Sequence, residues 1–286
     1  MNLGIIGAGK VGTTVGYLLQ RRGYSVVGIR NRTDESTARA AALLETRAAS
    51  TAVEVAAGSD LVLITTPDGR IEEVCREVAT GGGFRPGQVV LHMSGALSSS
   101  VLASARERGA RVASLHPLQS FARFDPAASL AGVYFTAEGD TEALRVSRDI
   151  ASKLEGRYLE ISPEAKVLYH ASACVMSNYF VALMDFGVRL FSHTGVKREE
   201  ALAAMLPLVE GTLANLKQVG LPHALTGPIS RGDVLTIRKH LVDLNRLGPE
   251  TLELYKALGR HTVQVARAKG TLDDRGAGEL LHWLQP

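Results

Sequence analysis

The stretch GIIGAGKVGTTVGYLL, residues 4–19, decides the fold of the amino-terminal half of the chain. Leu3–Ile6 is apolar enough for a buried parallel strand, and a helical pattern follows the glycines. Gly7, Gly9 and Gly12 have the spacing G-x-G-x-x-G, which permits a tight turn, the approach of a pyrophosphate and close helix packing, in that order. Because a helix N-terminus attracts phosphate, the stretch predicts a dinucleotide-binding site.

The second predicted strand, Tyr24–Ile29, indicates which dinucleotide binds. A site for NAD usually places Asp or Glu at the end of this strand, where the carboxylate accepts from the ribose 2′-OH. Here the chain instead reads Arg30, Asn31, Arg32 and Thr33. Guanidinium groups form charge-assisted bonds to phosphate oxygens, so this stretch favours the 2′-phosphate of NADP. The alternative is that both arginines lie in a solvated loop.

Strand and helix patterns continue to alternate after this point. Further strands are predicted at 61–65, 89–92, 110–115, 133–137 and 157–161, with a helix at 141–154. Ligands bind an open parallel sheet at the carboxyl ends of its strands. The predicted cofactor-binding residues are therefore Gly7, Gly9, Lys10, Val11, Gly12, Asn31, Arg32, Thr33, Thr65, Thr66, Pro67, Ser94 and Gly95.

The pattern changes at Ser162 and Pro163, a predicted helix cap and first helical residue, after which no strand pattern remains. We expect an α/β Rossmann domain with a mostly parallel sheet, residues 1–161, followed by an all-α domain, residues 162–286. The helical domain is expected to close over the nicotinamide and supply the substrate site. Residues 181–191, VALMDFGVRLF, are apolar on more than one face, which predicts a homodimer through the helical domains.

The composition is typical of a cytoplasmic enzyme. The chain has 286 residues, of which 45% are hydrophobic and 21% charged. A net charge of +3, from 32 basic and 29 acidic residues, is too balanced to indicate nucleic acid or a membrane as partner. No apolar run is expected to span a membrane, and no targeting segment is recognised. Cys75 and Cys174 are interpreted as buried free thiols, and no metal-ligand spacing is present.

Motifs spread along the chain carry a family resemblance. They are GAGKVG at 7–12, SGAL at 94–97, HPLQSF at 116–121, KVLYHASACVMSNY at 166–179 and GPISRGD at 227–233. With them the chain resembles the superfamily of NADP-dependent dehydrogenases whose helical C-terminal domain is like that of 6-phosphogluconate dehydrogenase. That superfamily includes the 3-hydroxyisobutyrate, ketopantoate, prephenate and pyrroline-5-carboxylate enzymes. More closely, it resembles a family of oxidoreductases in which a Rossmann-like domain precedes a helical domain of unknown function.

Candidate catalytic residues lie in SPEAKVLYHASACVMSNY, residues 162–179. Lys166 and His170 are four residues apart, so they share one helix face. A buried lysine is rare unless paired or functional, and here it can protonate a carbonyl oxygen as hydride arrives. The alternative is a lysine that reaches solvent beside a structural histidine. Enzymes of the hydroxyisobutyrate type, which the chain resembles, have Asn where His170 stands, so the identity of the proton donor stays open.

Two further stretches suggest catalytic or substrate contacts. His116 ends a predicted strand at the ligand-binding edge, and prephenate dehydrogenases, which the chain resembles, have a similar His-Pro near the hydride-transfer centre. A strand-end histidine that only fixes a loop is the alternative. Arg231 precedes a helix that Asp233 is expected to cap, and its guanidinium suits a substrate carboxylate, with an ion pair as the alternative. The predicted substrate-binding residues are Ser94, Gln119, Ser120, Asn178 and Arg231.

These observations predict an NADP-dependent dehydrogenase or reductase. Its expected reaction transfers a hydride between NADPH and a small carboxylate-bearing carbonyl compound, a ketopantoate-like 2-oxo or 3-oxo acid. The alternatives are an imine reductase of the pyrroline-carboxylate type and a regulator that binds NADP without catalysis. The predicted catalytic residues are Lys166, His170 and His116, and no metal is expected.

Overall fold

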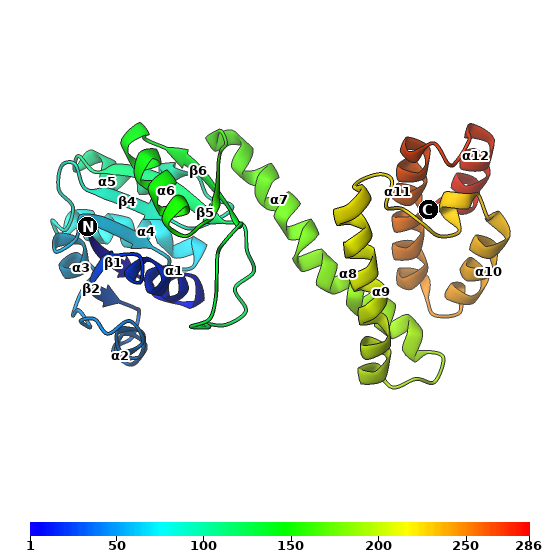
Figure 1. The fold of residues 1–286 in the computed structure, drawn as a ribbon, viewed down its shortest axis with the longest axis horizontal. Coiled ribbons are helices and arrows are strands. Elements are labelled where there is room, and N and C mark those ends of the chain that lie inside the picture. The colour runs from blue at the N-terminus through cyan, green and yellow to red at the C-terminus, as the bar shows by residue number, and fades with distance from the viewer. The chain divides into compact units, whose positions relative to one another are not determined.

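The computed structural model describes residues 1–286, which form two compact units, Met1–Leu183 and Met184–Pro286. The first unit is built on a seven-stranded sheet with the order β2-β1-β3-β4-β5-β6-β7 (Figure 1). Its strands are β1 (Asn2–Ile6), β2 (Ser25–Arg30), β3 (Leu61–Ile64), β4 (Val89–His92), β5 (Arg111–Pro117), β6 (Tyr134–Gly139) and β7 (Arg157–Glu160). Neighbouring strands are parallel except β5 and β6, so the sheet is mostly parallel, as predicted.

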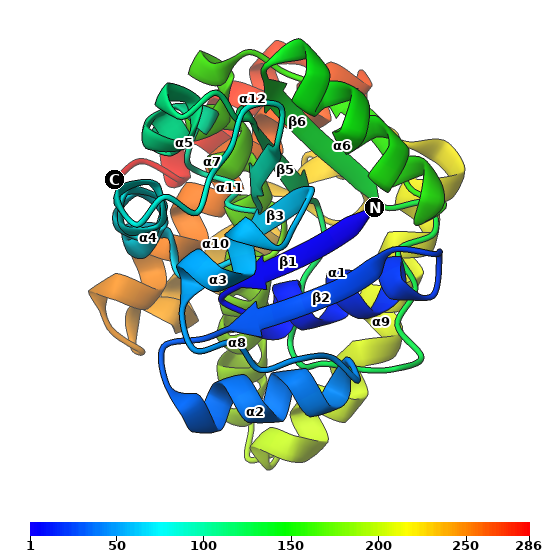
Figure 2. The same ribbon diagram turned by 90° about the vertical axis from the view of Figure 1, so that its left-hand side faces the viewer.

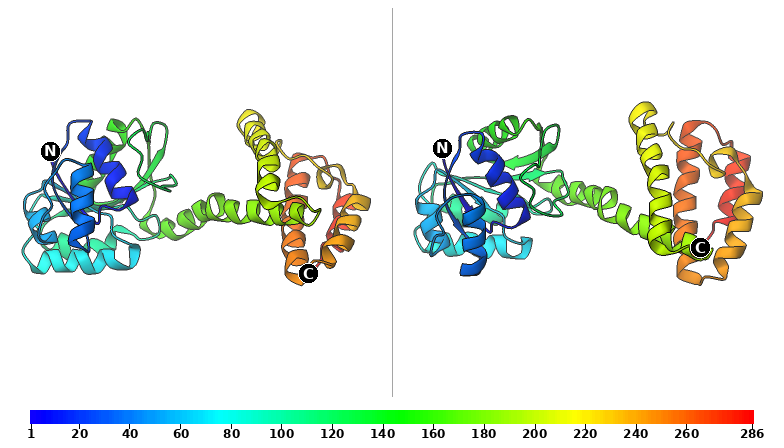
Figure 3. Two further views of the ribbon diagram at one scale, coloured as in Figure 1. Left: turned by 90° about the horizontal axis from the view of Figure 1, so that it is seen from below. Right: turned by 60° about the horizontal axis from the view of Figure 1, so that its bottom comes forward.

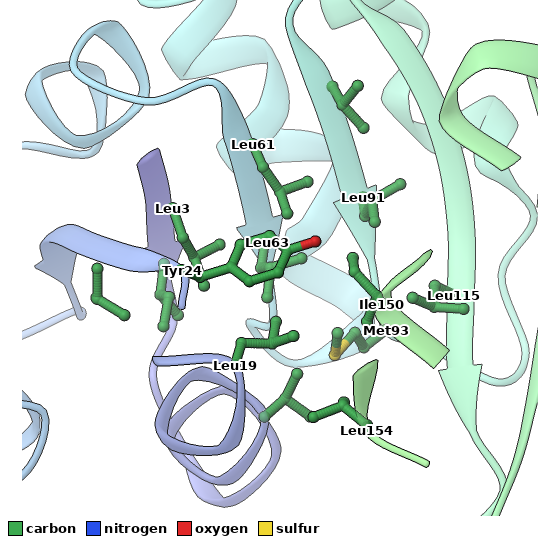
Figure 4. Packing of buried hydrophobic residues seen from close by; sticks show 14 of the residues in the cluster. Leu3, Leu19, Tyr24, Leu61, Leu63, Leu91, Met93, Leu115, Ile150 and Leu154 are labelled. Atoms are coloured by element: carbon green, nitrogen blue, oxygen red, sulfur yellow. The ribbon is translucent and has the colours of Figure 1, made fainter. Parts of the chain in front are cut away.

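Helices cover the sheet on both faces (Figure 2). They are α1 (Lys10–Gln20), α2 (Asp34–Leu43), α3 (Ala52–Ala57), α4 (Asp68–Thr80), α5 (Ala103–Glu107) and α6 (Thr141–Lys153), with short 3-10 turns η1 (Ser99–Leu102) and η2 (Pro163–Ala165). Leu3, Leu63 and Leu91 pack with α1 and α6 in one buried cluster (Figure 4). Val62 and Ile64 point to the other face and pack with α3, α4 and α5. Successive side chains of a buried strand point to opposite faces of the sheet, so the strands contribute to an apolar core on each face.

The strand order reverses at β1. From β1 the chain adds β2 on one side of the sheet and then β3 on the other side. Such a switch point leaves an open crevice outside the carboxyl ends of the strands, where ligands of doubly wound folds bind. Gly7 follows β1 and Thr65 follows β3 at this edge. The topology thus places the predicted cofactor residues where the fold offers a binding site.

The carboxyl-terminal part of the chain is helical, as predicted. Its elements are α7 (Lys166–Met176), α8 (Asn178–Ser192), α9 (Arg198–Val219), the short turn η3 (Ile229–Arg231), α10 (Val234–Asn245), α11 (Pro249–Lys269) and α12 (Asp274–Trp283). Ile237, Val263 and Leu280 form the buried centre of α10, α11 and α12, which pack side by side in both views of Figure 3. The second unit therefore has a core of its own.

The first compact unit extends to Leu183, because Lys166 in the first turn of α7 donates hydrogen bonds to Ser94 and Ser114 of this unit. Two details differ from the sequence-based expectations. The side chain of Ser162 makes no cap hydrogen bond, and the chain enters α7 through η2. The predicted long helix is interrupted at Ser177, between α7 and α8.

One helical stretch, Pro163–Ser192, is long and apolar enough to cross a membrane by length and composition alone. The expectation that no run reaches this length is therefore wrong. Core helices of soluble proteins pass the same test. Here the side chains of Val167, Leu168 and Met176 are 74%, 78% and 76% exposed.

Candidate active site

Each glycine of the fingerprint has a distinct reason to lack a side chain. Gly7 has φ +89°, and a Cβ there would lie 2.6 Å from the backbone nitrogen of Thr66. At Gly12 a Cβ would lie 2.2 Å from Oγ1 of Thr65, so the glycine lets α1 approach the end of β3. At Gly9 a Cβ would meet nothing closer than a carbonyl oxygen 3.9 Å away. Gly9 thus leaves open the space in front of the N-terminus of α1.

Polar atoms beside this turn fit a dinucleotide. The Thr65 hydroxyl donates to the carbonyl oxygen of Gly7 at 2.8 Å and pins the turn. Oγ1 of Thr66 and Oδ1 of Asn31 are buried without a hydrogen-bond partner. Because buried polar atoms are nearly always paired, two unpaired atoms beside an open glycine cradle suit a bound polar ligand. Lys10 is exposed at the first position of α1, where its charge would attract phosphate.

The two arginines of the loop after β2 differ in whether they bind other residues of the protein. Arg30 pairs with Asp34 at 2.7 Å and also donates to the carbonyl oxygen of Ala49. Thr33 caps α2 through a hydrogen bond from the backbone nitrogen of Ser36. Arg32 is exposed and makes no hydrogen bond or ion pair. Of the two arginines, Arg32 is therefore the one available for a 2′-phosphate.

The turn after β4 is held rigidly from within. The Ser94 hydroxyl donates to Oδ2 of Asp68 at 2.8 Å and accepts from the backbone nitrogens of Ala96 and Leu97. The fully buried His92 accepts from the backbone nitrogen of Ser94 through Nδ1, so its Nε2 donates to the carbonyl oxygen of Ser98 at 3.1 Å. These bonds give Ser94 a structural role and fix the position of Gly95 at the sheet edge.

Lys166 lies beneath this turn with 1% of its surface exposed, so the alternative of a lysine reaching solvent is wrong. Its Nζ donates to the carbonyl oxygen of Ser94 at 2.9 Å and to Oγ of Ser114 at 2.7 Å. Burial lowers the pKa of Lys166 to about 8, and the carboxylates of Glu138 and Asp68 oppose that shift. The ammonium is therefore mostly charged at neutral pH and acts on the site through its field.

Two imidazoles border Gly95. A Cβ at residue 95 would lie 3.0 Å from Cε1 and Nε2 of His116 and 2.7 Å from Cδ2 of His170. The two ring centroids are 6.5 Å apart. The fold thus brings together Gly95, His116 and His170, which the sequence predicted in three separate motifs.

The surroundings of His116 keep its ring neutral. Burial lowers its pKa to about 4, and its electrostatic interactions with Lys166 and His170 act in the same direction. Its Nδ1 lies 2.7 Å from the hydroxyl oxygen of Tyr169, on the α7 turn that also carries Lys166 and His170. A neutral ring at this place serves as a hydrogen-bond donor or acceptor rather than as a strong acid.

The remaining predicted substrate-binding residues are exposed. Gln119 and Ser120 are exposed just after β5, and Asn178 is exposed at the start of α8. Arg231 is an exposed residue of η3 in the second unit, where Asp233 caps α10 as predicted. Their substrate contacts stay predictions.

Cys75 is buried as predicted, whereas Cys174 is only partly buried, with its sulfur 3.8 Å from Nδ1 of His170. The interpretation of both cysteines as buried thiols is therefore wrong for Cys174. It lies one helical turn after His170, on the face of α7 that carries the site.

Sequence reasoning missed several residues that build the site. They are Asp68, His92, Ser114, Thr136, Glu138 and Tyr169. Tyr169 offered a signal, because it lies three residues after Lys166 and so shares its helix face. The strand residues offered none, since nothing in a single strand tells which helix its inward polar groups will meet.

Comparisons with known proteins agree with this architecture. Residues 1–117 match a Rossmann-like domain, and residues 133–262 match a domain of unknown function, DUF2520. No curated protein matches the chain.

Solved structures share the fold over nearly the whole length. Protein TM1727 from Thermotoga maritima is 24% identical, with a TM-score of 0.74 over 94% of this chain and 99% of that one. The 1-pyrroline-5-carboxylate reductase of Streptococcus pyogenes is 19% identical, with a TM-score of 0.63 over 99% and 98%. A pyrroline carboxylate reductase of Plasmodium falciparum, solved with NADP bound, is 11% identical, with a TM-score of 0.57 over 100% and 98%. The chain therefore has the fold of NAD(P)-binding oxidoreductases and joins a Rossmann-like domain to a DUF2520 domain.

Proposed function

We propose that the protein is an NADP-dependent reductase of a small carboxylate-bearing carbonyl compound, a 2-oxo or 3-oxo acid. The observation that carries the proposal is the cluster of Lys166, His116 and His170 around Gly95, at the edge where a doubly wound fold binds ligands. The resemblance to pyrroline carboxylate reductases in fold supports the cofactor class. It does not define the substrate, because a shared fold hosts many substrates.

The charge of the site favours a carbonyl over an imine substrate. A carbonyl group gains negative charge on oxygen as it is reduced, and a buried ammonium stabilises that charge. An imine is reduced as the cationic iminium, which the same ammonium disfavours. Lys166 is mostly charged at neutral pH. Because only 1% of its surface is exposed, water screens its electric field only weakly.

Each group of the chain then has a separate role. Gly9 admits the pyrophosphate to the N-terminus of α1, and Arg32 binds the 2′-phosphate. NADPH would supply the hydride. His116 and His170 donate hydrogen bonds to the carbonyl oxygen, and one of these rings passes its proton to that oxygen, which completes the alcohol as the hydride adds to carbon. Lys166 stabilises negative charge on the oxygen through the Ser94 turn that it supports.

Cofactor choice is tested by titrating NADPH and NADH into the wild type and Arg32→Ala. We expect Arg32→Ala to weaken NADPH binding by at least about tenfold, because it loses a charge-assisted phosphate contact. NADH binding should hardly change. Equal losses for both cofactors would contradict the assignment of the 2′-phosphate to Arg32. Arg39→Ala is a matched control, since Arg39 is an exposed arginine of α2 paired with Glu35.

The reaction is tested by following NADPH oxidation with a panel of 2-oxo acids, 3-oxo acids and cyclic imino acids. Turnover of oxo acids alone supports the proposal. Turnover of cyclic imino acids alone would favour an imine reductase, the activity named for the Streptococcus pyogenes protein of similar fold. NADPH binding without turnover across the whole panel would favour a regulator that binds NADP.

The proposal includes a homodimer formed through the helical part of the chain. Helix α7 exposes Val167, Leu168 and Met176 by about three-quarters of their surface, as helices do when another subunit covers them. One face of α7 carries Lys166 and His170 and packs in the site. We propose that a second copy of this chain covers the exposed apolar side chains of the same helix. Light scattering at micromolar concentration should give twice the chain mass, and a monomer would overturn this part of the proposal.

A further inference from the structure

The hydroxyl of Tyr169 contacts the ring of His116 at Nδ1, the nitrogen that does not border Gly95. Its oxygen lies 2.7 Å from Nδ1 of His116, and the two rings meet edge to face at 5.7 Å and 81°. The other nitrogen, Nε2, is the one beside the Cβ position of Gly95. Nδ1 of His116 is thus hydrogen-bonded to Tyr169, while Nε2 faces Gly95, where the proposed function places the substrate.

Both partners of this contact are neutral at physiological pH. Burial raises the pKa of Tyr169 above its ordinary value, although the Thr136 hydroxyl lowers it in part. Burial and electrostatic interactions with Lys166 and His170 lower the pKa of His116 to about 4. The pair therefore holds one phenol proton and one imidazole proton, and the bond can be made in two ways. Either Tyr169 donates to Nδ1, or Nδ1 donates to Tyr169.

The acid strengths of the two groups decide between these two ways. The phenol O–H is the stronger donor of the pair, and the lone pair of a neutral imidazole nitrogen is the stronger acceptor. The oxygen and Nδ1 lie 2.7 Å apart, the distance of such a hydrogen bond. Tyr169 therefore donates its proton to Nδ1 of His116.

We propose that Tyr169 is a positioning residue that donates to Nδ1 of His116 and so keeps the imidazole proton on Nε2, facing Gly95. Tyr169 and His116 then form a chain of two donors that ends at Nε2, beside Gly95. The tautomer follows from these contacts alone. Its consequence, a fixed N–H donor for a carbonyl oxygen, rests on the proposed function.

The tautomer can be measured without a substrate. In the full-length protein labelled with ¹⁵N-histidine, two-bond ¹H–¹⁵N correlations show which ring nitrogen carries the proton. His116→Gln identifies the signals of His116 by their loss. In the wild type at pH 7 we expect Nε2 to be protonated and Nδ1 to have the shift of an acceptor. A proton on Nδ1 would overturn the proposal.

Tyr169→Phe keeps the ring and removes only the donor. We expect the signals of His116 to lose their single-tautomer pattern and turnover to fall by about tenfold, with NADPH affinity unchanged. An unchanged tautomer in Tyr169→Phe would overturn the positioning role. If the protein proves inactive on every substrate, the spectra still decide the tautomer, so the proposed function can fail separately. Tyr255→Phe is the matched control, because Tyr255 lies 2.7 Å from Nδ1 of His240 in the other unit.

Discussion

Two histidine–tyrosine pairs of almost the same geometry lie in different surroundings. His116 and Tyr169 join at 2.7 Å in the first unit, with ring centroids 5.7 Å apart. His240 and Tyr255 also join at 2.7 Å, between α10 and α11 of the second unit, with centroids 5.9 Å apart. His240 is exposed, whereas His116 is largely enclosed beside Lys166 and His170. The contact is the same, so any difference in role must come from what surrounds it.

The surroundings act through burial and charge. Enclosure and the neighbouring Lys166 and His170 hold the ring of His116 neutral, and its Nε2 lies 3.0 Å from the position that a Cβ on Gly95 would take. A buried, polarised group at a ligand-binding edge is a candidate for catalysis, whereas a contact made by an exposed histidine on a helix surface contributes little. The comparison therefore predicts that equal substitutions in the two pairs have very different effects.

The largest effect is expected for His116→Gln against His240→Gln. Loss of the His116 ring removes a positioned donor, so turnover should fall by about 10² to 10⁴. His240→Gln should leave turnover within about twofold of the wild type, because it removes an exposed surface contact. Steady-state NADPH oxidation measures both. Similar losses in the two variants would mean that the surroundings of His116 do not matter for its role.

A smaller loss is expected for Lys166→Met, which removes the buried cation but keeps most of the side chain. Turnover should fall by at least about 10², with NADPH affinity close to that of the wild type. The variant also leaves Ser94 and Ser114 without a donor, which costs about 1–3 kcal/mol of stability. Because the Lys166 charge lowers the pKa of His116, that pKa should rise in the variant.

Lys153→Met provides the control for Lys166→Met, since Lys153 is an exposed lysine of α6 whose ion pair is with Asp149. It should change neither turnover nor the pKa of His116. Normal turnover in Lys166→Met would remove the buried cation from the mechanism and leave the imidazoles as the reacting groups.

The fold was largely predictable because its signals are local. The G-x-G-x-x-G spacing and the apolar runs at 61–65 and 89–92 specify strands and turns through their own side chains. The position of His116 at a strand end and of Asp233 at a helix cap followed from the same kind of signal. Each of these depends on residues that are neighbours in the sequence.

The chemistry of the site was less predictable because it depends on contacts between distant residues. The sequence placed Lys166 and His170 on one helix face, but not Lys166 under the carbonyl oxygen of Ser94, 72 residues earlier. Thr136 lies beside His116 only because β6 pairs with β5 in antiparallel register. Such pairings are set by the packing of the whole unit, which no single motif encodes.

A still smaller effect is expected for Gly95→Ala, which perturbs the enclosed pair without removing a polar group. The new Cβ would lie 2.7 Å from His170 and 3.0 Å from His116, so both rings must move. Displacing reacting groups by up to an ångström should reduce turnover by about 10-fold to 10²-fold. Gly69→Ala is the control, because a Cβ there meets nothing within 4 Å. Unchanged turnover in Gly95→Ala would mean that the rings do not act from their observed positions.

The smallest effect concerns stability in mild acid, where buried histidines should differ from exposed ones. Burial lowers the pKa of His92 and of His116 to about 4, against an ordinary value near 6.5. Between these values the unfolded chain binds protons that the folded chain does not, so stability falls as pH decreases from 6.5 toward 4. Each histidine should contribute up to about 1.4 kcal/mol per pH unit. Denaturant unfolding at pH 6.5 and 5, where carboxylates stay mostly ionised, measures this dependence.

Replacing one of these rings should remove its share of the acid dependence. His92→Gln and His116→Gln should each flatten the loss of stability between pH 6.5 and 5 by about one bound proton. Lys166 does not enter this window, because its pKa of about 8 keeps it charged throughout. An unchanged slope in His116→Gln would mean that its ring titrates normally in the folded protein. The enclosed pair would then differ from the exposed pair in position alone, and catalysis by His116 would rest on geometry without a shifted pKa.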